Sequence, residues 1–395
     1  MMNSGTVSEL DTRVDLARLS KFIGGKNALV AQGGGQRGIF TAGVLDAFML
    51  SNFDPFEEFF GTSAGALNLS AFLCRQPELG KSFIVDLTTD PQFFHLFSYI
   101  RRKQYLNLDW ALDRICDFPY RLDLDMGRQV LGQRKAFAAV TSTRTLSDFY
   151  FPILGPQWRD VLIATCAIPR LYPREVELAH QPYIDGGVSA SIPVQEAWRR
   201  EARFIAVIRT ESLDEEPGAR VPLETDHEPV QWFRDSFNTI QHQWQNKLVQ
   251  WKEDWNSFFS QQIEKSKLAK MEHKHLGTLN GGRWLFGADD IYRLSHLIGD
   301  KFDSGLADML MVHYQTYSLT CDFLRTPPDD TFIVQIAPSS PLKSSSLLSS
   351  VEDLMHDYEL GREAGMRFVS SYLNANELKS QRLKQAAGLH PDRGE

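Results

Sequence analysis

The sequence is poor in cysteine and has no excess of positive charge. Its four cysteines in 395 residues are widely spaced and form no CxxC pair: Cys74, Cys116, Cys166 and Cys321. This spacing argues against a disulfide framework and a cysteine zinc site, and it suits a reducing compartment. With 42 basic and 50 acidic residues the formal net charge is −8, which does not favour nucleic acid. We therefore expect no nucleic-acid partner.

Long apolar runs are also absent. No stretch reaches the roughly 18 charge-free apolar residues that a membrane-spanning helix needs, and residues 1–26 lack the apolar segment of a secretory signal. We therefore expect a cytoplasmic protein. Any contact with a membrane would be peripheral and would come from a local patch.

The sequence does contain an alternation of short apolar strands and helical patterns. Residues 27–31 predict a strand, and a glycine cluster separates it from a helix over 38–50. A second strand near 56–60 ends at Gly61 and leads into a helix from Ala64. Two strand–turn–helix units in succession indicate βαβ connections and a parallel sheet, so the predicted fold class is α/β.

The segment GTSAG, residues 61–65, matches the G-x-S-x-G pattern of a nucleophile elbow. In this pattern a sharp turn between a strand and a helix exposes the serine hydroxyl, here that of Ser63. The glycines on either side, Gly61 and Gly65, relieve the crowding of the turn. The start of the helix directs free N–H groups and its positive end at a developing anion.

The segment GGGQRG, residues 33–38, also lies between a strand and a helix, and it allows two interpretations. Its spacing fits the G-x-G-x-x-G of dinucleotide-binding proteins, which requires an acidic residue about twenty positions later at the end of the next strand. Asp54 and Glu57 lie ahead of that strand or at its start, and the strand ends in GTSAG instead. This placement favours the second interpretation, an oxyanion hole formed by backbone N–H groups.

Asp185 opens the segment DGG, residues 185–187, after a short predicted strand. Alone, this pattern is typical of a turn. Beside a serine nucleophile, a carboxylate can take the serine proton where burial raises its basicity. Eight histidines follow Asp185, but most lie in a polar region or in the C-terminal tail, and none follows an evident strand. A Ser–His–Asp triad is therefore disfavoured.

The three glycine-rich sites, in this order, resemble those of the patatin-like phospholipase family. GGGQRG matches its oxyanion motif, GTSAG its elbow and DGG its aspartate, while AIPRLYP at 167–173 is similar to a segment ahead of that aspartate. The resemblance covers residues 27–210 and, more weakly, the strand from 331 and the helix after it. It implies a three-layer sandwich with a largely parallel central sheet, hydrolysis of lipid esters, and no metal or other cofactor.

Carried over to this sequence, the resemblance implies that Ser63 attacks the ester carbonyl while Asp185 accepts its proton and later activates water. The oxyanion would be bound by the N–H groups of Gly33, Gly34 and Gly35. Arg37 would stabilise the glycine loop or bind a lipid phosphate. That Arg37 is only a solvent-exposed arginine of the loop is an equal alternative. The supporting positions that remain are Gly38, Gly61, Gly65, Gly186 and Gly187.

We expect five parts along the chain. They are an N-terminal extension (1–26), a catalytic core (27–210), a helical insertion (211–330), a returning strand and helix of the core (331–375) and a flexible tail (376–395). Within the core, the mixed aromatic and charged residues ahead of 135 predict a lid or a helical excursion. Within the insertion, residues 237–259 carry an aromatic-rich apolar stripe. It is expected either to pack on the main domain or a partner helix, or to bind a lipid surface.

The expected function is that of a serine lipid acyl hydrolase of the phospholipase A or lysophospholipase type. A general carboxylesterase or an acyltransferase of the same fold is the nearest alternative. An alternative from a different class of function is a protein that binds lipid surfaces and whose Ser–Asp dyad catalyses no reaction. A nucleotide-binding domain built on GGGQRG would leave GTSAG and DGG unexplained.

Overall fold

The structure is a computed structural model that describes residues 15–95, 105–169, 171–213 and 304–386. The aromatic-rich segment 237–259 and most of the expected insertion lie outside these residues. Beyond residue 213, the described part of the insertion is residues 304–330, most of which form helix α12 (Ser304–Arg325).

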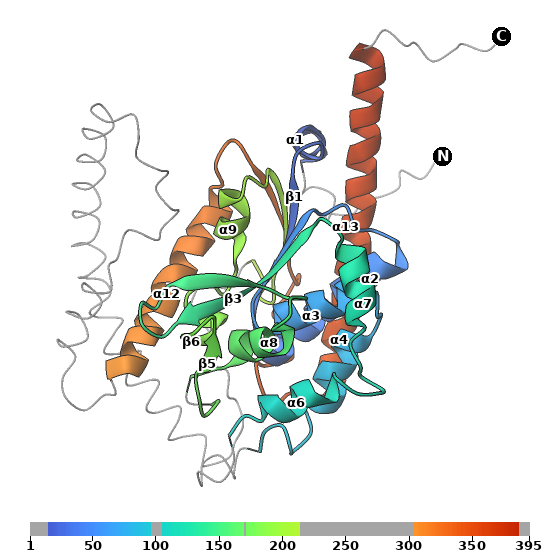
Figure 1. The fold of residues 1–395 in the computed structure, drawn as a ribbon. Helices are drawn as coiled ribbons and strands as arrows, with labels where there is room; N and C mark the ends of the chain where they lie inside the picture. Colours follow the sequence, from blue (N-terminus) through green and yellow to red (C-terminus); the bar gives the residue numbers. More distant parts are fainter. Residues whose placement is uncertain (1–14, 96–104, 170, 214–303, 387–395) are drawn as a thin grey trace, which may run out of the picture. The chain divides into compact units, whose positions relative to one another are not determined.

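The described residues form one sheet of eight strands in the order β5-β6-β3-β2-β1-β7-β8, with β4 paired to β3 (Figure 1). Strands β3, β2, β1, β7 and β8 pair in parallel, whereas β4, β5 and β6 pair antiparallel. The strands are β1 (Asn27–Ala31), β2 (Glu58–Gly61), β3 (Lys135–Ser142), β4 (Asp148–Pro152), β5 (Val176–Leu178), β6 (Gln181–Asp185), β7 (Phe204–Ile208) and β8 (Phe332–Ile336). The predicted α/β fold with a largely parallel sheet is confirmed.

Helices fill most of the connections between the strands. The region ahead of β3, for which the sequence allowed a lid or a helical excursion, is helical over much of its described length. The helices are α1 (Leu16–Phe22), η1 (Gly35–Arg37), α2 (Gly38–Leu50), α3 (Ala64–Leu73), α4 (Leu79–Ser82), η2 (Phe83–Leu87), α6 (Leu108–Arg114), α7 (Leu124–Leu131), α8 (Trp158–Cys166), η3 (Gly186–Val188), α9 (Val194–Arg199), α12 and α13 (Val351–Ala386). Among the described helices, none combines the length and the apolar character needed to cross a bilayer.

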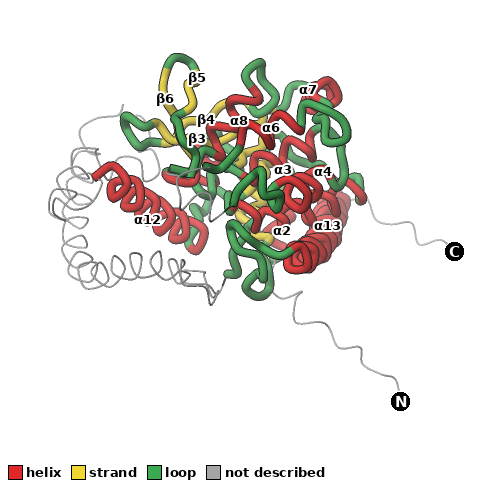
Figure 2. The backbone as a smooth tube through the Cα atoms, turned by 90° about the horizontal axis from the view of Figure 1, so that it is seen from below, coloured by secondary structure: helices red, strands yellow, loops and turns green. Residues whose placement is uncertain are grey.

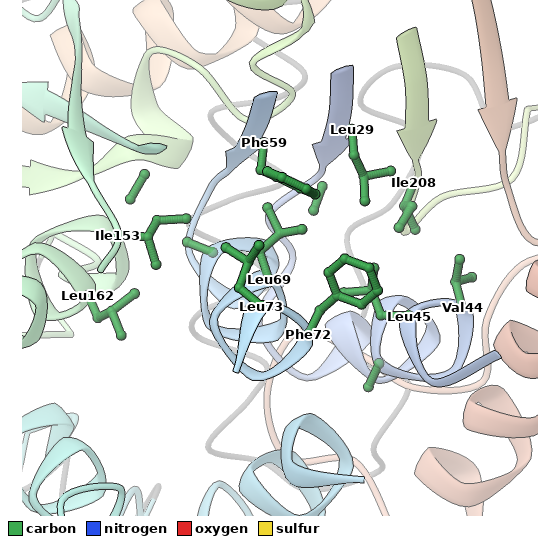
Figure 3. Close-up of a cluster of buried hydrophobic side chains, with 14 of the residues drawn as sticks. Leu29, Val44, Leu45, Phe59, Leu69, Phe72, Leu73, Ile153, Leu162 and Ile208 are labelled. Atoms are coloured by element: carbon green, nitrogen blue, oxygen red, sulfur yellow. The ribbon is translucent and has the colours of Figure 1, made fainter. Parts of the chain in front are cut away.

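Helices cover both faces of the sheet, because successive residues of a strand point to opposite faces. Leu29 and Phe59 belong to a large buried cluster with α2, α3 and α13, whereas their neighbours Val30 and Phe60 pack in a second cluster with α9 and α12. Figure 2 shows α12 apart from the group formed by α2, α3 and α13. Figure 3 shows Leu29, Phe59 and Ile208 pointing from the strands toward α2 and α3. The result is a three-layer sandwich.

Helix α13 packs closely on α2, because small residues of the two helices face each other. A Cβ atom on Gly361 would lie 2.1 Å from the carbonyl oxygen of Phe40, and one on Gly43 would lie 2.1 Å from that of Tyr358. The hydroxyl of Tyr358 donates to the buried carboxylate of Asp46 at 2.7 Å. The C-terminal helix is therefore an integral part of the core that carries the glycine loop and the elbow.

We expect Gly361→Val to lower the free energy of unfolding by about 3 kcal/mol, since overpacking against a helix backbone forces the two helices apart. Urea denaturation measures this change. The matched control is Glu363→Val, which introduces the same side chain on the same helix at a position with a 66% exposed side chain. Equal stability of the two variants would contradict the close packing.

The C-terminal helix is longer than the sequence suggested. A flexible tail was expected from residue 376, but α13 continues to Ala386. Residues 376–386 include several strong helix formers, namely Glu, Leu, Lys, Gln and Ala. Arg382 also donates to the carbonyl oxygen of Ala17 at 3.3 Å and to the hydroxyl of Ser20 at 3.1 Å, so this part of α13 is tied to α1.

Candidate active site

Ser63 lies in the sharp turn between β2 and α3, with φ 51° and ψ −124°. A positive φ is uncommon for a residue other than glycine, and it is the strained geometry that a nucleophile elbow requires. The chain comes very close to itself around this turn. A Cβ atom on Gly65 would lie 2.4 Å from the carbonyl oxygen of Ala31, and one on Gly61 would lie 2.7 Å from the Cα of Ala66. The GTSAG pattern therefore forms the turn that the sequence predicted.

Thr165 of α8 binds the backbone of this turn, a role that the sequence did not suggest. The N–H of Ser63 donates to Thr165 Oγ1 at 2.9 Å, and the Thr165 hydroxyl donates to the carbonyl oxygen of Ala139 at 2.5 Å. Thr165 is fully buried. The strained serine is thus connected to β3 through Thr165, which lies 102 residues away from it in sequence. No local pattern around Thr165 could have indicated this contact.

The glycine loop, residues 33–36, runs directly beside Ser63. A Cβ atom on Gly33 would lie 3.6 Å from the Cβ of Ser63. The N–H of Gly33 donates to the carbonyl oxygen of Ser191 at 3.0 Å, so it is not free to bind an oxyanion, and the expectation for Gly33 needs correction. The N–H groups of Gly34 and Gly35 have no acceptor among the described residues. These two glycines are the candidate oxyanion donors.

Asp185 ends β6 and has a nearly buried carboxyl group, with the residue 7% exposed. Its Oδ1 accepts a hydrogen bond from the N–H of Gly187 at 2.5 Å. Burial raises the pKa of Asp185 to about 7, against the opposing effect of that N–H group. A carboxylate with a pKa near the working pH suits general-base catalysis. The backbone is again tightly packed, because a Cβ atom on Gly186 would lie 2.1 Å from the carbonyl oxygen of Ala139.

The buried thiol of Cys166 links the two candidate residues. It interacts with the Ser63 side chain and is subject to the charge of Asp185. Burial, followed by this charge, raises the pKa of Cys166 well above its ordinary value. The group therefore stays a neutral thiol and does not compete with Ser63 as a nucleophile.

A pocket with an empty volume of about 750 Å³, including the open space at its mouth, extends from Ser63. The residues that line it include Gly35, Ser63 and Cys166 of the candidate site. Most of the wall is apolar and comes from α3 and from the helices and loops ahead of β3. It includes Leu67, Ala71, Phe83, Ile84, Phe93, Leu106, Leu108, Ile115 and Leu122. Ser346 and Leu347, far along the chain, complete the lining. The excursion predicted ahead of residue 135 thus forms much of the pocket wall.

Arg37 forms an ion pair with Glu211, with 3.0 Å between Nη1 and Oε1 and only 17% of the arginine side chain exposed. Of the alternatives that the sequence left open, the structure favours an arginine that steadies the glycine loop over a solvated one. Burial acts to raise the pKa of Glu211, but the charge of Arg37, together with hydrogen bonds, more than offsets this and leaves the pKa below its ordinary value. The carboxylate therefore stays charged.

Comparison with known proteins agrees with this geometry. Residues 29–198 match the family model described as Patatin-like phospholipase, and residues 303–377 match a domain of unknown function, DUF6363. The uncharacterized protein YjjU of Escherichia coli (strain K12) is 32% identical over 354 residues, which cover 89% of this chain and 80% of that protein. VipD from Legionella pneumophila, a solved structure, is 12% identical with a TM-score of 0.32 over 88% of this chain and 67% of that chain, a likeness too low to carry an argument. The chain belongs to the patatin-like phospholipase family, and so, at the level of the family, to the lipid acyl hydrolases.

Proposed function

We propose that this protein hydrolyses a fatty-acyl ester of a phospholipid or lysophospholipid, with Ser63 as nucleophile and Asp185 as base. The observation that carries the proposal is the position of Ser63 and Gly35 on the lining of a largely apolar pocket. An acyl chain that enters this pocket gains about 0.8 kcal/mol for each buried methylene. Its ester carbonyl would then lie beside Ser63, with the polar headgroup toward solvent.

In the proposed reaction, Asp185 takes the proton of the Ser63 hydroxyl as Oγ attacks the ester carbonyl. The negative charge that develops on the carbonyl oxygen is stabilised by the N–H groups of Gly34 and Gly35 and by the N-terminal end of α3. The glycerol oxygen leaves with the proton held by Asp185, and the fatty acid remains esterified to Ser63. Asp185 then deprotonates a water molecule, which attacks the acyl-enzyme and releases the fatty acid as Ser63 regains its proton.

The proposal is tested by fatty-acid release from mixed phospholipid and detergent micelles in the presence of EDTA, with a soluble butyrate ester as a second substrate. We expect release of free fatty acid from the micelles. Hydrolysis of the butyrate alone would indicate a general carboxylesterase, and transfer of the acyl group to an alcohol in preference to water would indicate an acyltransferase. Binding to lipid without hydrolysis of any ester would indicate an idle dyad.

Ala71→Phe is expected to shorten the acyl chain that the protein accepts. Ala71 is buried on α3 and lines the pocket, so a phenyl ring there would occupy space meant for methylene groups. Exclusion of two methylenes at about 0.8 kcal/mol each would lower kcat/KM for a palmitoyl ester by roughly tenfold. Rates with a series of p-nitrophenyl esters measure this effect. The butyrate rate serves as the internal control, and an unchanged ratio of palmitate to butyrate rates would contradict the pocket assignment.

A further inference from the structure

The region that matches a domain of unknown function, residues 303–377, is linked to the glycine loop by two sets of contacts. One comes from α12, where Tyr317 binds Glu211, and Glu211 binds the residues on either side of the loop. The other comes from residues 344–350, here called the anchor loop, through Ser346. Both lie beyond residues 29–198, which match the phospholipase model, and neither belongs to the Ser–Asp dyad.

On the first side, a single carboxylate ties both ends of the glycine loop to α12. The hydroxyl of Tyr317 donates a short hydrogen bond to Glu211 Oε2. Glu211 also binds Arg37, at 3.0 Å, and the side-chain amide of Gln32, at 3.2 Å, and it forms an ion pair with Arg209 at 3.7 Å. Gln32 directly precedes the glycine loop and Arg37 directly follows it. Glu211 therefore connects the two ends of the loop, and Tyr317 holds Glu211.

Gln32, Arg37, Arg209, Glu211 and Tyr317 are here called the glycine-loop cluster. The protonation states of Glu211 and Tyr317 are determined by their surroundings. Burial, followed by the charge of Glu211, raises the pKa of Tyr317, so the phenol stays protonated and remains a donor. Arg209, itself 6% exposed, donates to Gln32 Oε1 at 2.9 Å and to the Tyr317 hydroxyl at 3.2 Å. Except for Arg37 Nε, which is buried with no partner among the described residues, these side chains bind one another, which makes the cluster costly to disturb.

On the second side, the anchor loop holds Gly35 and Gln36, at the C-terminal end of the glycine loop. The N–H of Gln36 donates to the carbonyl oxygen of Ser346 at 2.9 Å, and the N–H of Ser349 donates to Gln36 Oε1 at 2.8 Å. The anchor loop is fastened in turn, because the fully buried carboxylate of Asp357 accepts from the N–H and the hydroxyl of Ser344 at 2.7 Å and 2.6 Å. Gly35, with φ +58°, lies so close that a Cβ atom would be 2.2 Å from the Ser346 oxygen.

Helix α12 also touches the segment that follows the candidate base. His313 Nδ1 lies 2.6 Å from the carbonyl oxygen of Gly187, the residue whose N–H donates to Asp185. The same helix therefore contacts the aspartate segment and, one turn later through Tyr317, the glycine-loop cluster.

We propose that residues 303–377 position the glycine loop of the active site. In this proposal Tyr317 is a positioning residue: it holds Glu211, and Glu211 keeps the N–H groups of Gly34 and Gly35 directed toward the oxyanion. A run of three glycines has unusual conformational freedom, and fixing each residue costs about 1–2 kcal/mol. Oxyanion donors contribute to catalysis only if they are preorganised. The contacts from α12 and the anchor loop supply that order. This inference rests on the proposed hydrolase function.

The test compares Tyr317→Phe with the matched control Tyr314→Phe, which removes the same atom from the same helix at an exposed position. The substrate is a soluble p-nitrophenyl butyrate, so that lipid binding does not enter. We expect Tyr317→Phe to lower kcat by roughly tenfold, less than the roughly 10²- to 10³-fold that removal of a whole oxyanion donor costs, with KM unchanged. The Ki of a trifluoromethyl ketone, whose oxyanion adduct depends on the glycine N–H groups, should rise by the same factor. The melting temperature should stay close to that of Tyr314→Phe.

Two results would overturn the inference alone: a kcat equal to that of Tyr314→Phe in an active enzyme, or a lower kcat with an unchanged Ki for the ketone. A wild-type protein that hydrolyses no ester would overturn the proposed function, and the inference with it. If Tyr317→Phe does not fold, Glu211→Gln replaces it, because the change keeps the shape of the side chain but removes the charge that pairs with Arg37. The same parallel loss of kcat and ketone affinity is then expected.

Discussion

Ser63→Ala is expected to lower fatty-acid release on the order of 10⁴- to 10⁶-fold. Ser63 is the pocket serine at the nucleophile elbow beside the glycine loop, whereas the hydroxyls of Ser70 and Thr88 donate to the carbonyl oxygens of Ala66 and Ile84. The neighbouring Cys166 is held as a neutral thiol and cannot take over. Binding of substrate should change little, since the hydroxyl contributes almost nothing to the apolar wall that holds the acyl chain. The measurement is initial-rate fatty-acid release from mixed micelles, with direct binding of a non-hydrolysable ether lipid as the second readout.

Ser370→Ala serves as the control, because it removes the same hydroxyl from an exposed position on α13. We expect it to retain the wild-type rate. If Ser63→Ala kept more than about a hundredth of the wild-type rate, acyl transfer to Ser63 would be excluded as the main route, and the elbow would be a structural turn.

Asp185→Asn is expected to lower kcat/KM on the order of 10³- to 10⁴-fold, the range found when a general base is removed from a serine nucleophile. The amide has the shape of the carboxyl group and can still accept from the N–H of Gly187, so the fold should be preserved. It cannot accept the serine proton. Asp54→Asn is the control, because it makes the same change in another aspartate whose side chain is only 10% exposed. Asp54 precedes β2 and so lies near the end of that strand opposite to Ser63.

The same residue predicts the pH dependence of the wild-type enzyme. Burial raises the pKa of Asp185 to about 7, so the carboxyl group is protonated below that pH and cannot act as a base. We expect kcat/KM to rise about tenfold for each pH unit up to about pH 7 and to level off above it. The residual activity of Asp185→Asn should lack this rise. A wild-type profile that stays flat from pH 5 to pH 8 would contradict the assignment of the base.

The local features of this site were predictable because short-range sterics determine them. The turn around Ser63 needs glycine at positions 61 and 65, and the structure puts backbone atoms within 3 Å of where their side chains would be. The bounds of β1 and α2 also followed from apolar patterns and the glycine break between them in the sequence. Each of these signals is carried by a stretch of fewer than fifteen residues.

The remaining features depend on contacts between distant parts of the chain, which no local pattern records. The N–H of Gly33 looked equivalent to its neighbours in the sequence, but the carbonyl oxygen of Ser191 occupies it. Thr165 and Tyr317 support the site from helices whose sequences carry no catalytic motif. The apolar pocket forms only when the helices ahead of β3 fold back over α3, so its lining could not be read from hydrophobicity alone.

The most direct test of the central claim is to label the protein with a long-chain alkyl fluorophosphonate and to locate the adduct by peptide mass spectrometry. The reagent phosphonylates an activated serine and places its alkyl chain where an acyl chain would lie. We predict one adduct per chain, on Ser63, with activity lost in proportion to labelling and with no adduct in Ser63→Ala. Loss of activity with the adduct on another residue, or full activity with Ser63 labelled, would contradict the account.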